Sequence, residues 1–414
     1  MNQTYWIETL GCPKNEVDSE KLAGTLDEEG MIPANSIEIA DLVVVNTCAF
    51  IEDAKKESIE TIYALNEART ENSNLVVTGC MAERYGKDLQ DAFDDEVDAV
   101  VGFGVPVTLK EKPEIPEFDL LNLPRPKTHN QWGYVKVAEG CDRICGFCSI
   151  PSFRGPQRSR TMASIKQEIQ TMDLQEVVLV AQDLASYGRD IPDDVSIINL
   201  YKETSELVPW VRLLYLYPSS LTKGLVDLIA DSPVPYFDLS LQHVSRPLLK
   251  RMRRWGDSQK FSETIQRIRR QNRESVFRTN FIVGYPGETE EDHDKLLQFV
   301  EENELDWCGF FAYSREEGTF AASLDNQVDI NLVRERMQEL NELQDVITAN
   351  HRDSLVGARV EVLVDSNGTA RSFREAPEID GVIHVPENLK VGAFSTVKVV
   401  EATGTDLVAT NYLS

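Results

Sequence analysis

The sequence predicts a multidomain α/β protein with an N-terminal parallel α/β sheet domain, a central partial (β/α)6 TIM-like barrel and a small C-terminal antiparallel β-barrel. Apolar strand-like runs alternate with helical stretches over most of the 414 residues, which is typical of parallel sheets. From Gly357 onward, short alternating runs separated by turn residues indicate a small all-β domain. We place the three domains at residues 1–120, 127–351 and 352–414.

The N-terminal domain is expected to bring three distant cysteines together. Strands are predicted at residues 5–9, 41–46, 75–78 and 97–102, with helices at 16–29, at 53–66 and after the third strand. Cys12, Cys48 and Cys80 each follow the carboxyl end of one of these strands. Ligands bind at that edge of open α/β sheets, so the three thiols could form one site. The alternative is three small buried residues, since free cysteine often packs as a hydrophobe.

A proline-rich linker is predicted at residues 106–129, and strand–helix alternation resumes after it. The expected barrel strands are residues 134–138, 176–181, 211–216, 236–241, 276–283 and 307–313, followed by a long helix at 327–351. The functional residues of such a barrel cluster at the carboxyl ends of its strands. The C-terminal strands are predicted at 359–364, 382–385, 394–400 and 407–412.

Charge and cysteine content narrow the class of protein. The formal net charge is −27, and residues 1–120 alone hold 9 basic and 26 acidic side chains, a net of −17. A protein that binds nucleic acid over a large surface is expected to be basic. The negative electrostatic field of this chain therefore favours a basic protein partner. The alternative is an acidic surface that serves solubility alone. We expect no membrane span and no signal peptide. Seven cysteines, an odd number, indicate a reduced, cytoplasmic protein.

A compact cysteine motif follows the first predicted barrel strand. Cys141, Cys145 and Cys148 have C-x3-C-x2-C spacing. Three thiolates can hold three irons of a 4Fe–4S cube and leave the fourth iron open for a ligand. A structural zinc site needs four ligands, and no fourth cysteine or histidine follows within this loop. The motif therefore favours an iron–sulfur cluster.

The segment EGCDRICGFCSIPSFRGPQRSR around this motif resembles the radical S-adenosylmethionine superfamily. The resemblance implies a 4Fe–4S cluster on the three cysteines, with S-adenosylmethionine on the open iron and an aromatic residue, Phe147, before the last cysteine. GCPKNEVDSE, VVNTCAF and TGCMAERY resemble the methylthiotransferase family, which implies a second 4Fe–4S cluster on Cys12, Cys48 and Cys80. The last sixty residues resemble the TRAM domain of that family. Cys308 has no counterpart in these motifs, and we interpret it as a core residue.

Two short motifs resemble the branch of the family that modifies a protein. Cys12-Pro13-Lys14-Asn15 and the segment APEIDG at 376–381 are typical of enzymes that act on an aspartate of small-subunit ribosomal protein twelve. The acidic field fits a basic ribosomal protein, whereas an acidic C-terminal domain of net −3 should repel RNA, which makes tRNA an unlikely partner. A tRNA adenosine methylthiotransferase remains an alternative, as does a non-catalytic iron–sulfur electron-transfer protein.

The resemblance also implies a reaction. S-adenosylmethionine is cleaved reductively to a 5′-deoxyadenosyl radical, which abstracts hydrogen from the β-carbon of the aspartate. The N-terminal cluster holds sulfur, and a second S-adenosylmethionine supplies the methyl group. A radical is needed because no side-chain base removes a proton from such a carbon at neutral pH. The resemblance further implies a sulfur donor and an electron donor such as flavodoxin or ferredoxin.

Residues within or just after the predicted strands are further candidates for binding S-adenosylmethionine. They are Gln182, Asp183, Gln242, Arg278 and Gly284. Four of them have a structural alternative: a helix cap for Gln182 and Asp183, a buried ion pair for the arginine and a turn for the glycine. His243 is interpreted as a core histidine. The group at Arg251, Arg253 and Arg254 is interpreted as a solvated helix face that could also meet an acidic substrate segment or the reductant.

Overall fold

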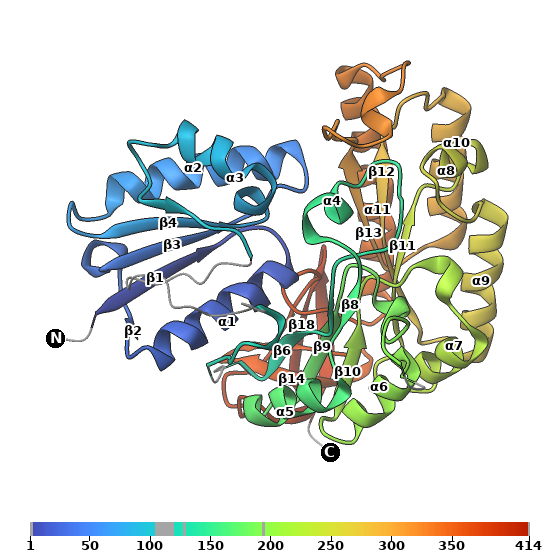
Figure 1. Cartoon of the computed structure of the whole chain (residues 1–414). Helices are drawn as coiled ribbons and strands as arrows, with labels where there is room; N and C mark the ends of the chain where they lie inside the picture. The colour runs from blue at the N-terminus through green and yellow to red at the C-terminus, as the bar shows by residue number, and fades with distance from the viewer. Residues whose placement is uncertain (1–2, 104–119, 127–129, 193–194, 413–414) are drawn as a thin grey trace.

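The computed structural model describes residues 3–103, 120–126, 130–192 and 195–412, and it confirms the predicted fold class. An N-terminal sheet domain lies beside a half-open barrel, and helix α1 (Pro13–Glu28) contacts both (Figure 1). The C-terminal strands lie against the barrel (Figure 1). Within the described ranges, no helix is long and apolar enough to cross a membrane.

The N-terminal sheet is parallel throughout, in the order β2-β1-β3-β4-β5. Its strands are β1 (Thr4–Thr9), β2 (Ile32–Pro33), β3 (Leu42–Thr47), β4 (Asn74–Gly79) and β5 (Ala99–Val100), and its other helices are α2 (Glu52–Ala68) and α3 (Cys80–Ala92). All six residues of β3 are buried, as expected for a central strand that helices cover on both faces. The sequence did not reveal β2, which is only two residues long.

Six parallel strands form the partial barrel in sequence order. They are β6 (Trp132–Lys136), β9 (Glu176–Val180), β10 (Trp210–Leu213), β11 (Tyr236–Gln242), β12 (Val276–Val283) and β13 (Trp307–Ala312). They form two three-stranded sheets, β10-β9-β6 and β11-β12-β13, joined by a bridge between Leu216 and Leu239. A short hairpin of β7 (Ala138–Glu139) and β8 (Arg158–Ser159) follows β6 and frames the compact cysteine motif.

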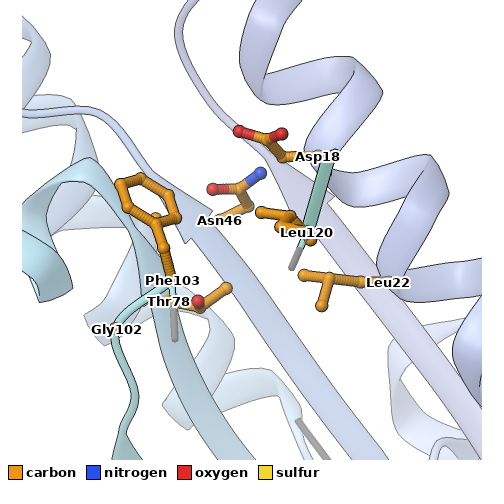
Figure 2. Close-up of a pocket in the computed structure, with 8 residues that line it drawn as sticks. Asp18, Leu22, Asn46, Thr78, Gly102, Phe103 and Leu120 are labelled. Atoms are coloured by element: carbon orange, nitrogen blue, oxygen red, sulfur yellow. The ribbon is translucent and has the colours of Figure 1, made fainter. Parts of the chain in front are cut away.

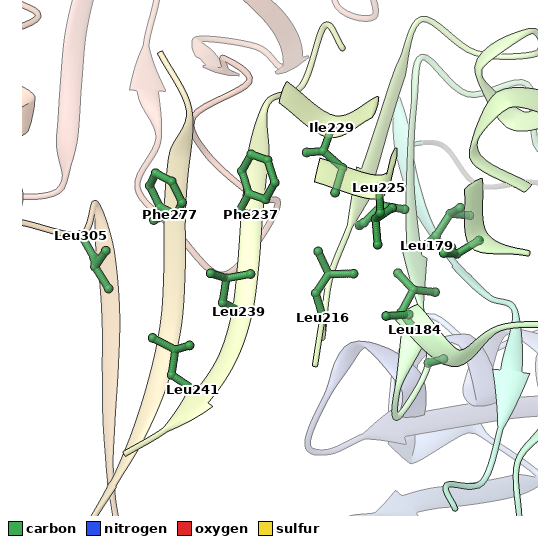
Figure 3. Packing of buried hydrophobic residues seen from close by; sticks show 14 of the residues in the cluster. Leu179, Leu184, Leu216, Leu225, Ile229, Phe237, Leu239, Leu241, Phe277 and Leu305 are labelled. Atoms are coloured by element: carbon green, nitrogen blue, oxygen red, sulfur yellow. The ribbon is translucent and has the colours of Figure 1, made fainter. Parts of the chain in front are cut away.

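Helices cover the outer face of the barrel. They are α5 (Met162–Met172), α6 (Ile197–Ser205), α7 (Lys223–Ala230), α8 (Arg246–Arg251), α9 (Ser258–Gln271), α10 (Glu290–Asn303) and α11 (Ile330–Asp353). Helix α4 (Ile150–Arg154) instead follows the compact cysteine motif and contacts α3 of the N-terminal domain. Phe237 and Leu239 of β11 belong to the same buried cluster as Leu225 and Ile229 of α7 (Figure 3). Full burial stabilises a large apolar side chain by about 1.5–3 kcal/mol, so this layer holds the strands in place.

The C-terminal domain is a closed barrel in the order β14-β15-β16-β18-β17. Its strands are β14 (Arg359–Ser366), β15 (Thr369–Arg371), β16 (Ile383–His384), β17 (Phe394–Thr403) and β18 (Asp406–Asn411). The sequence did not reveal β15. The prediction of an antiparallel barrel holds for every pair but one, because β16 and β18 are parallel. These two strands are not consecutive, because β17 lies between them in the chain, so no hairpin constrains their direction.

The C-terminal domain covers the face of the barrel strands that points away from the helices. Glu176 of β9 pairs with Arg212 of β10 at 2.8 Å and with Arg371 at 2.7 Å, and all three side chains are buried. The Tyr134 hydroxyl donates to the Pro377 carbonyl at 2.9 Å. These contacts attach segment 371–380 of the C-terminal domain to the inside of the barrel.

The end of the predicted linker is folded against both neighbouring domains, which corrects that part of the prediction. Leu120 and Leu121 are buried at a single turn of 3-10 helix, and Arg125 pairs with Glu168 at 2.9 Å. Most of the predicted linker, residues 106–119 and 127–129, lies outside the described residues. Two leucines among prolines were too weak a signal to predict a packed segment.

Candidate active site at two cysteine trios

The fold brings the three distant cysteines together around Asn15. Cys12 precedes α1, Cys48 follows β3, and Cys80 is the first residue of α3. The Asn15 amide donates to the Leu10 carbonyl at 2.9 Å and to the Thr47 carbonyl, next to Cys48, at 3.1 Å. The Cys80 sulfur lies 3.6 Å from the Asn15 side-chain oxygen. The three sulfurs therefore share one edge of the parallel sheet.

Burial keeps most of the thiols protonated when they hold no metal. It raises the pKa of Cys48 and Cys148 to about 12 and that of Cys141 to about 11, and it also raises the pKa of Cys80. At Cys12 burial opposes ionisation, but Lys14 and Arg154 outweigh it and lower the pKa. A cluster would bind the thiolates and release protons, and its iron charge would offset the cost of burying them.

Backbone hydrogen bonds hold the compact trio in one loop. The Cys141 amide donates to the Gly155 carbonyl at 3.0 Å, and the Gly146 amide donates to the Met252 carbonyl at 2.8 Å. A Cβ atom at Gly146 would lie 3.0 Å from the Arg251 carbonyl oxygen and 3.1 Å from the Tyr285 hydroxyl. Contacts from two other loops therefore shape the segment that carries the three cysteines.

The number of thiols in each trio suits a 4Fe–4S cluster. Among the described residues, no three Cys, His, Asp or Glu side chains are placed to hold one metal ion. Each trio offers three thiols and no fourth cysteine within the loop. Three thiols per trio are the set that a cubane with one open iron requires.

Gln182 and Asp183 follow β9 and present unpaired acceptors. The Gln182 amide donates to Glu139 at 2.6 Å, while its oxygen has no hydrogen-bond partner within the described part of the chain. One Asp183 oxygen accepts from Arg143 at 2.6 Å and from Ser186 at 2.7 Å, and the other has no partner there. Neither side chain caps the helical turn that follows. Buried acceptors of this kind suit an ammonium group, such as the amino group of S-adenosylmethionine.

The remaining predicted binding residues have structural partners. Arg278 is the third residue of β12 and faces Asp238 at 3.4 Å and Asp380 at 3.5 Å, which favours the ion-pair alternative. Gly284 has φ +80°, and a Cβ there would lie 2.3 Å from Val333, which favours close packing on α11. Phe147 is half-buried against the barrel core.

Gln242 and His243 follow one another at the end of β11. Gln242 has φ +72°, a strained conformation for a residue with a side chain, at a break in the β11–β12 register. Strain of this kind is often found at binding sites, so Gln242 stays a candidate. His243 is fully buried and accepts a hydrogen bond from the Ser245 amide at 3.0 Å, as the interpretation of a core histidine predicts.

The arginine group after α8 is not simply a solvated helix face, which corrects that interpretation. Helix α8 ends at Arg251, and Arg254 turns inward to donate a hydrogen bond to the Cys145 sulfur at 3.3 Å. The Arg254 guanidinium also lies 4.2 Å from the ring centroid of Tyr217. Sequence spacing could not find this contact, because 109 residues separate the two partners.

Two further residues near the N-terminal trio were missed. Arg154 donates to the Cys80 sulfur at 3.0 Å, and Lys14 lies 3.5 Å from the ring centroid of Tyr215. Arg154 is six residues beyond the last cysteine of the compact motif, and Lys14 is part of the Cys12 motif. Their closeness in sequence to the two cysteine motifs was the only signal that could have identified them.

The two cysteine-bearing domains are also joined at the loop after β13. Glu316 is buried and pairs with Arg84 of α3 at 2.6 Å and with Lys55 of α2 at 3.3 Å. The Arg84 guanidinium also donates to the Ala49 carbonyl, next to Cys48, at 3.0 Å. The N-terminal domain is thus held to the barrel beside its own cysteine loop.

A small pocket lies on the N-terminal domain between α1 and the sheet. Asp18, Leu22, Asn46 and Leu120 are among the residues that line it (Figure 2). Both Asp18 and Asn46 take part in contacts that support the trio, because the Asn46 amide donates to the Asn15 carbonyl at 2.8 Å.

Replacing Glu16 by glutamine is expected to stabilise the protein at pH 8 and to have little effect at pH 4. Burial and the neighbouring Glu378 carboxyl raise the pKa of Glu16 to about 7, against about 4.3 for an ordinary glutamate. The folded state therefore binds the proton more tightly, and its stability falls as pH rises through 7. Thermal unfolding at the two pH values measures this. An equal change in Tm at both values would contradict the shifted ionisation.

Comparisons with known proteins agree with this architecture. Residues 4–102 match Uncharacterized protein family UPF0004, residues 135–300 match the Radical SAM superfamily, and residues 356–411 match the TRAM domain. Membership of the radical S-adenosylmethionine superfamily implies S-adenosylmethionine and a 4Fe–4S cluster.

Curated relatives match over nearly the full chain. Ribosomal protein uS12 methylthiotransferase RimO from Aquifex aeolicus (strain VF5) is 40% identical, over 97% of this chain and 95% of the relative. The proteins of the same name from Thermoanaerobacter sp. (strain X514) and Thermotoga maritima are 40% and 39% identical, over 97% and 95% of this chain and 98% and 96% of the relatives. The chain therefore belongs to the RimO family of ribosomal protein uS12 methylthiotransferases, within the radical S-adenosylmethionine superfamily.

Proposed function

We propose that this enzyme adds a methylthio group to the β-carbon of an aspartate in ribosomal protein uS12. The observation that carries the proposal is the presence of two cysteine trios, one on each domain, connected through the buried Arg154. Methylthio transfer to an unactivated carbon needs both a means to open a C–H bond and a place to hold sulfur. Two trios, each able to leave one iron open, provide one site for each task.

The residues divide between the two tasks. Cys141, Cys145 and Cys148 would hold the cluster that works with S-adenosylmethionine, and Cys12, Cys48 and Cys80 would hold the second 4Fe–4S cluster. When bound, these groups supply radical cleavage of a C–H bond and delivery of sulfur. The unpaired oxygens of Gln182 and Asp183 would accept hydrogen bonds from the amino group of S-adenosylmethionine and orient it. Arg254 would support the thiolate of Cys145 through its hydrogen bond.

Charge and exposed apolar groups support a polypeptide substrate. The net charge of −27 attracts a basic ribosomal protein and repels nucleic acid. Both cysteine loops expose an apolar side chain: Ile144, next to Cys145, is 71% exposed, and Phe50, two residues after Cys48, is 44% exposed. Exposed apolar groups at the mouth of a site suit contact with a polypeptide loop.

Direct comparison of substrates tests the proposal. The reconstituted enzyme, with S-adenosylmethionine, sulfide and a strong reductant, is offered purified uS12 or tRNA at the same salt concentration. We expect mass spectrometry to find a methylthio increment on one aspartate of uS12 and none on tRNA. Methylthiolated adenosine would favour the tRNA alternative, and a lack of 5′-deoxyadenosine would favour a non-catalytic iron–sulfur protein.

The proposed function can also be tested in cells, where the enzyme meets its natural substrate. Small-subunit proteins from cells with and without this enzyme should differ by a methylthio group on one uS12 aspartate. In this proposal the reaction takes place in the cytoplasm, with electrons from a flavodoxin or ferredoxin and sulfur from a separate donor. We retain 1–120, 127–351 and 352–414 as the proposed domain boundaries.

A further inference from the structure

Arg154 is the side chain that links the two cysteine trios. It ends the short helix α4, six residues after Cys148, and is only 6% exposed. One guanidinium nitrogen donates to the Cys80 sulfur and to the Asn15 side-chain oxygen, both at 3.0 Å. The other pairs with Glu139 at 2.8 Å and with Asp18 at 3.4 Å. The compact motif thus supplies a cation to a cysteine of the other trio.

The contacts of Arg154 continue toward the predicted S-adenosylmethionine site. Glu139 lies two residues before Cys141 and accepts a hydrogen bond from Gln182 at 2.6 Å. Hydrogen bonds and ion pairs therefore connect Gln182, Glu139, Arg154 and the Cys80 sulfur in series. Networks of this kind fix the position and charge of each member.

Charges in this network are balanced within the protein. Lys136 is fully buried and pairs with Glu139 at 2.7 Å and with Asp18. Two cations thus face two carboxylates. The guanidinium is the one of these groups that contacts a cysteine sulfur, so its positive charge and its N–H group act on that sulfur directly.

We propose that Arg154 is a positioning residue that raises the reduction potential of the cluster held by Cys12, Cys48 and Cys80. This inference rests on the proposed function, in which those cysteines hold a cluster. Reduction adds negative charge to a cluster, and a buried cation with an N–H···S hydrogen bond stabilises the reduced form. Because the same arginine is anchored through Glu139 beside Cys141, the barrel sets the electronic properties of a site on the neighbouring domain.

Variants of Arg154 test this with the full-length, reconstituted enzyme. Anaerobic redox titration followed by electron paramagnetic resonance gives the midpoint potential of each cluster, and Cys145→Ala, which should keep only the N-terminal cluster, assigns the signals. Arg154→Lys keeps the charge but loses the two-pronged donor geometry. The double variant Arg154→Gln with Glu139→Gln removes one cation and one carboxylate together, which avoids leaving a buried charge unpaired.

We expect the double variant to make one-electron reduction of the N-terminal cluster tenfold less favourable, a fall of about 59 mV. Arg154→Lys should produce a smaller fall, and the barrel cluster should keep its potential. Arg160→Lys is the matched control: Arg160 is 4% exposed and pairs with Glu168 at 2.7 Å, and its hydrogen bonds go to Lys136, Ser164 and Asn122. It should leave both potentials unchanged.

Three results would overturn the proposal. One is an N-terminal potential that stays the same in both Arg154 variants, and another is an equal shift in Arg160→Lys. The third is loss of the folded state in both Arg154 variants, which would make the residue purely structural. The iron content of the wild-type enzyme tests the proposed function separately. About four irons per chain, instead of about eight, would mean that the second cluster is absent altogether.

Discussion

Replacing Cys145 by alanine is expected to reduce 5′-deoxyadenosine formation from S-adenosylmethionine to the level of a sample without enzyme. The compact trio would retain two thiols, too few to hold a cubane with one open iron. The loop itself should keep its shape, because the Gly146 amide and carbonyl are held by Met252 and Ala321. The N-terminal trio lies on another domain and should keep about four irons of about eight.

Cys308→Ala provides the control for this experiment. Cys308 is a half-buried cysteine of β13 that packs against the barrel core, and burial raises the pKa of its thiol. Its removal should leave the iron content and 5′-deoxyadenosine formation at wild-type levels. Continued cleavage of S-adenosylmethionine by Cys145→Ala, or an equal loss in Cys308→Ala, would show that the compact motif does not hold the reactive cluster.

Replacing Cys48 by alanine is expected to separate the two halves of the reaction. Cleavage of S-adenosylmethionine should continue, because the compact trio is untouched, while the methylthio product on uS12 should disappear. Cys48 lies at the end of β3, where Ser58 of α2 holds its backbone amide and carbonyl at 3.0 Å. Removing one sulfur therefore changes the ligand set and leaves the fold intact. Iron analysis, 5′-deoxyadenosine measurement and mass spectrometry of uS12 together check this.

Ser58→Ala is the companion variant to Cys48→Ala. It removes the hydroxyl that supports the Cys48 backbone but keeps all three thiols, so it should lower stability while retaining the second cluster. We expect Ser58→Ala to lose stability but keep sulfur insertion, and Cys48→Ala to lose sulfur insertion. If Cys48→Ala still methylthiolates uS12, the N-terminal trio does not deliver the sulfur.

Much of the site could be predicted because its signals are local in sequence. Cys141, Cys145 and Cys148 lie within one loop, so their spacing alone indicates a shared metal site. The distant trio was predictable for a different reason: Cys12, Cys48 and Cys80 each follow a strand of one parallel sheet, and such strands end at the same edge.

The wrong or incomplete predictions share a physical cause. The interpretation of Arg254 as part of a solvated helix face considered only its neighbours in the sequence, but its inward turn depends on Cys145 and Tyr217, which are distant in sequence. The packed end of the linker also depends on a partner that is distant in sequence, because Arg125 pairs with Glu168. Arg278 combined a suitable residue type with a suitable strand, but its place early in β12 and its two acidic partners favour an ion pair.

The order of domains, the two sets of three cysteines and the acidic charge can be read from the amino-acid sequence, because strand periodicity, ligand spacing and charge are properties of the chain. Which cations reach the sulfurs depends on how the chain folds. Arg154 and Arg254 reach Cys80 and Cys145 across 74 and 109 residues. A buried guanidinium has to find a carboxylate or sulfur partner wherever the folded chain places one, and no sequence periodicity encodes that distance.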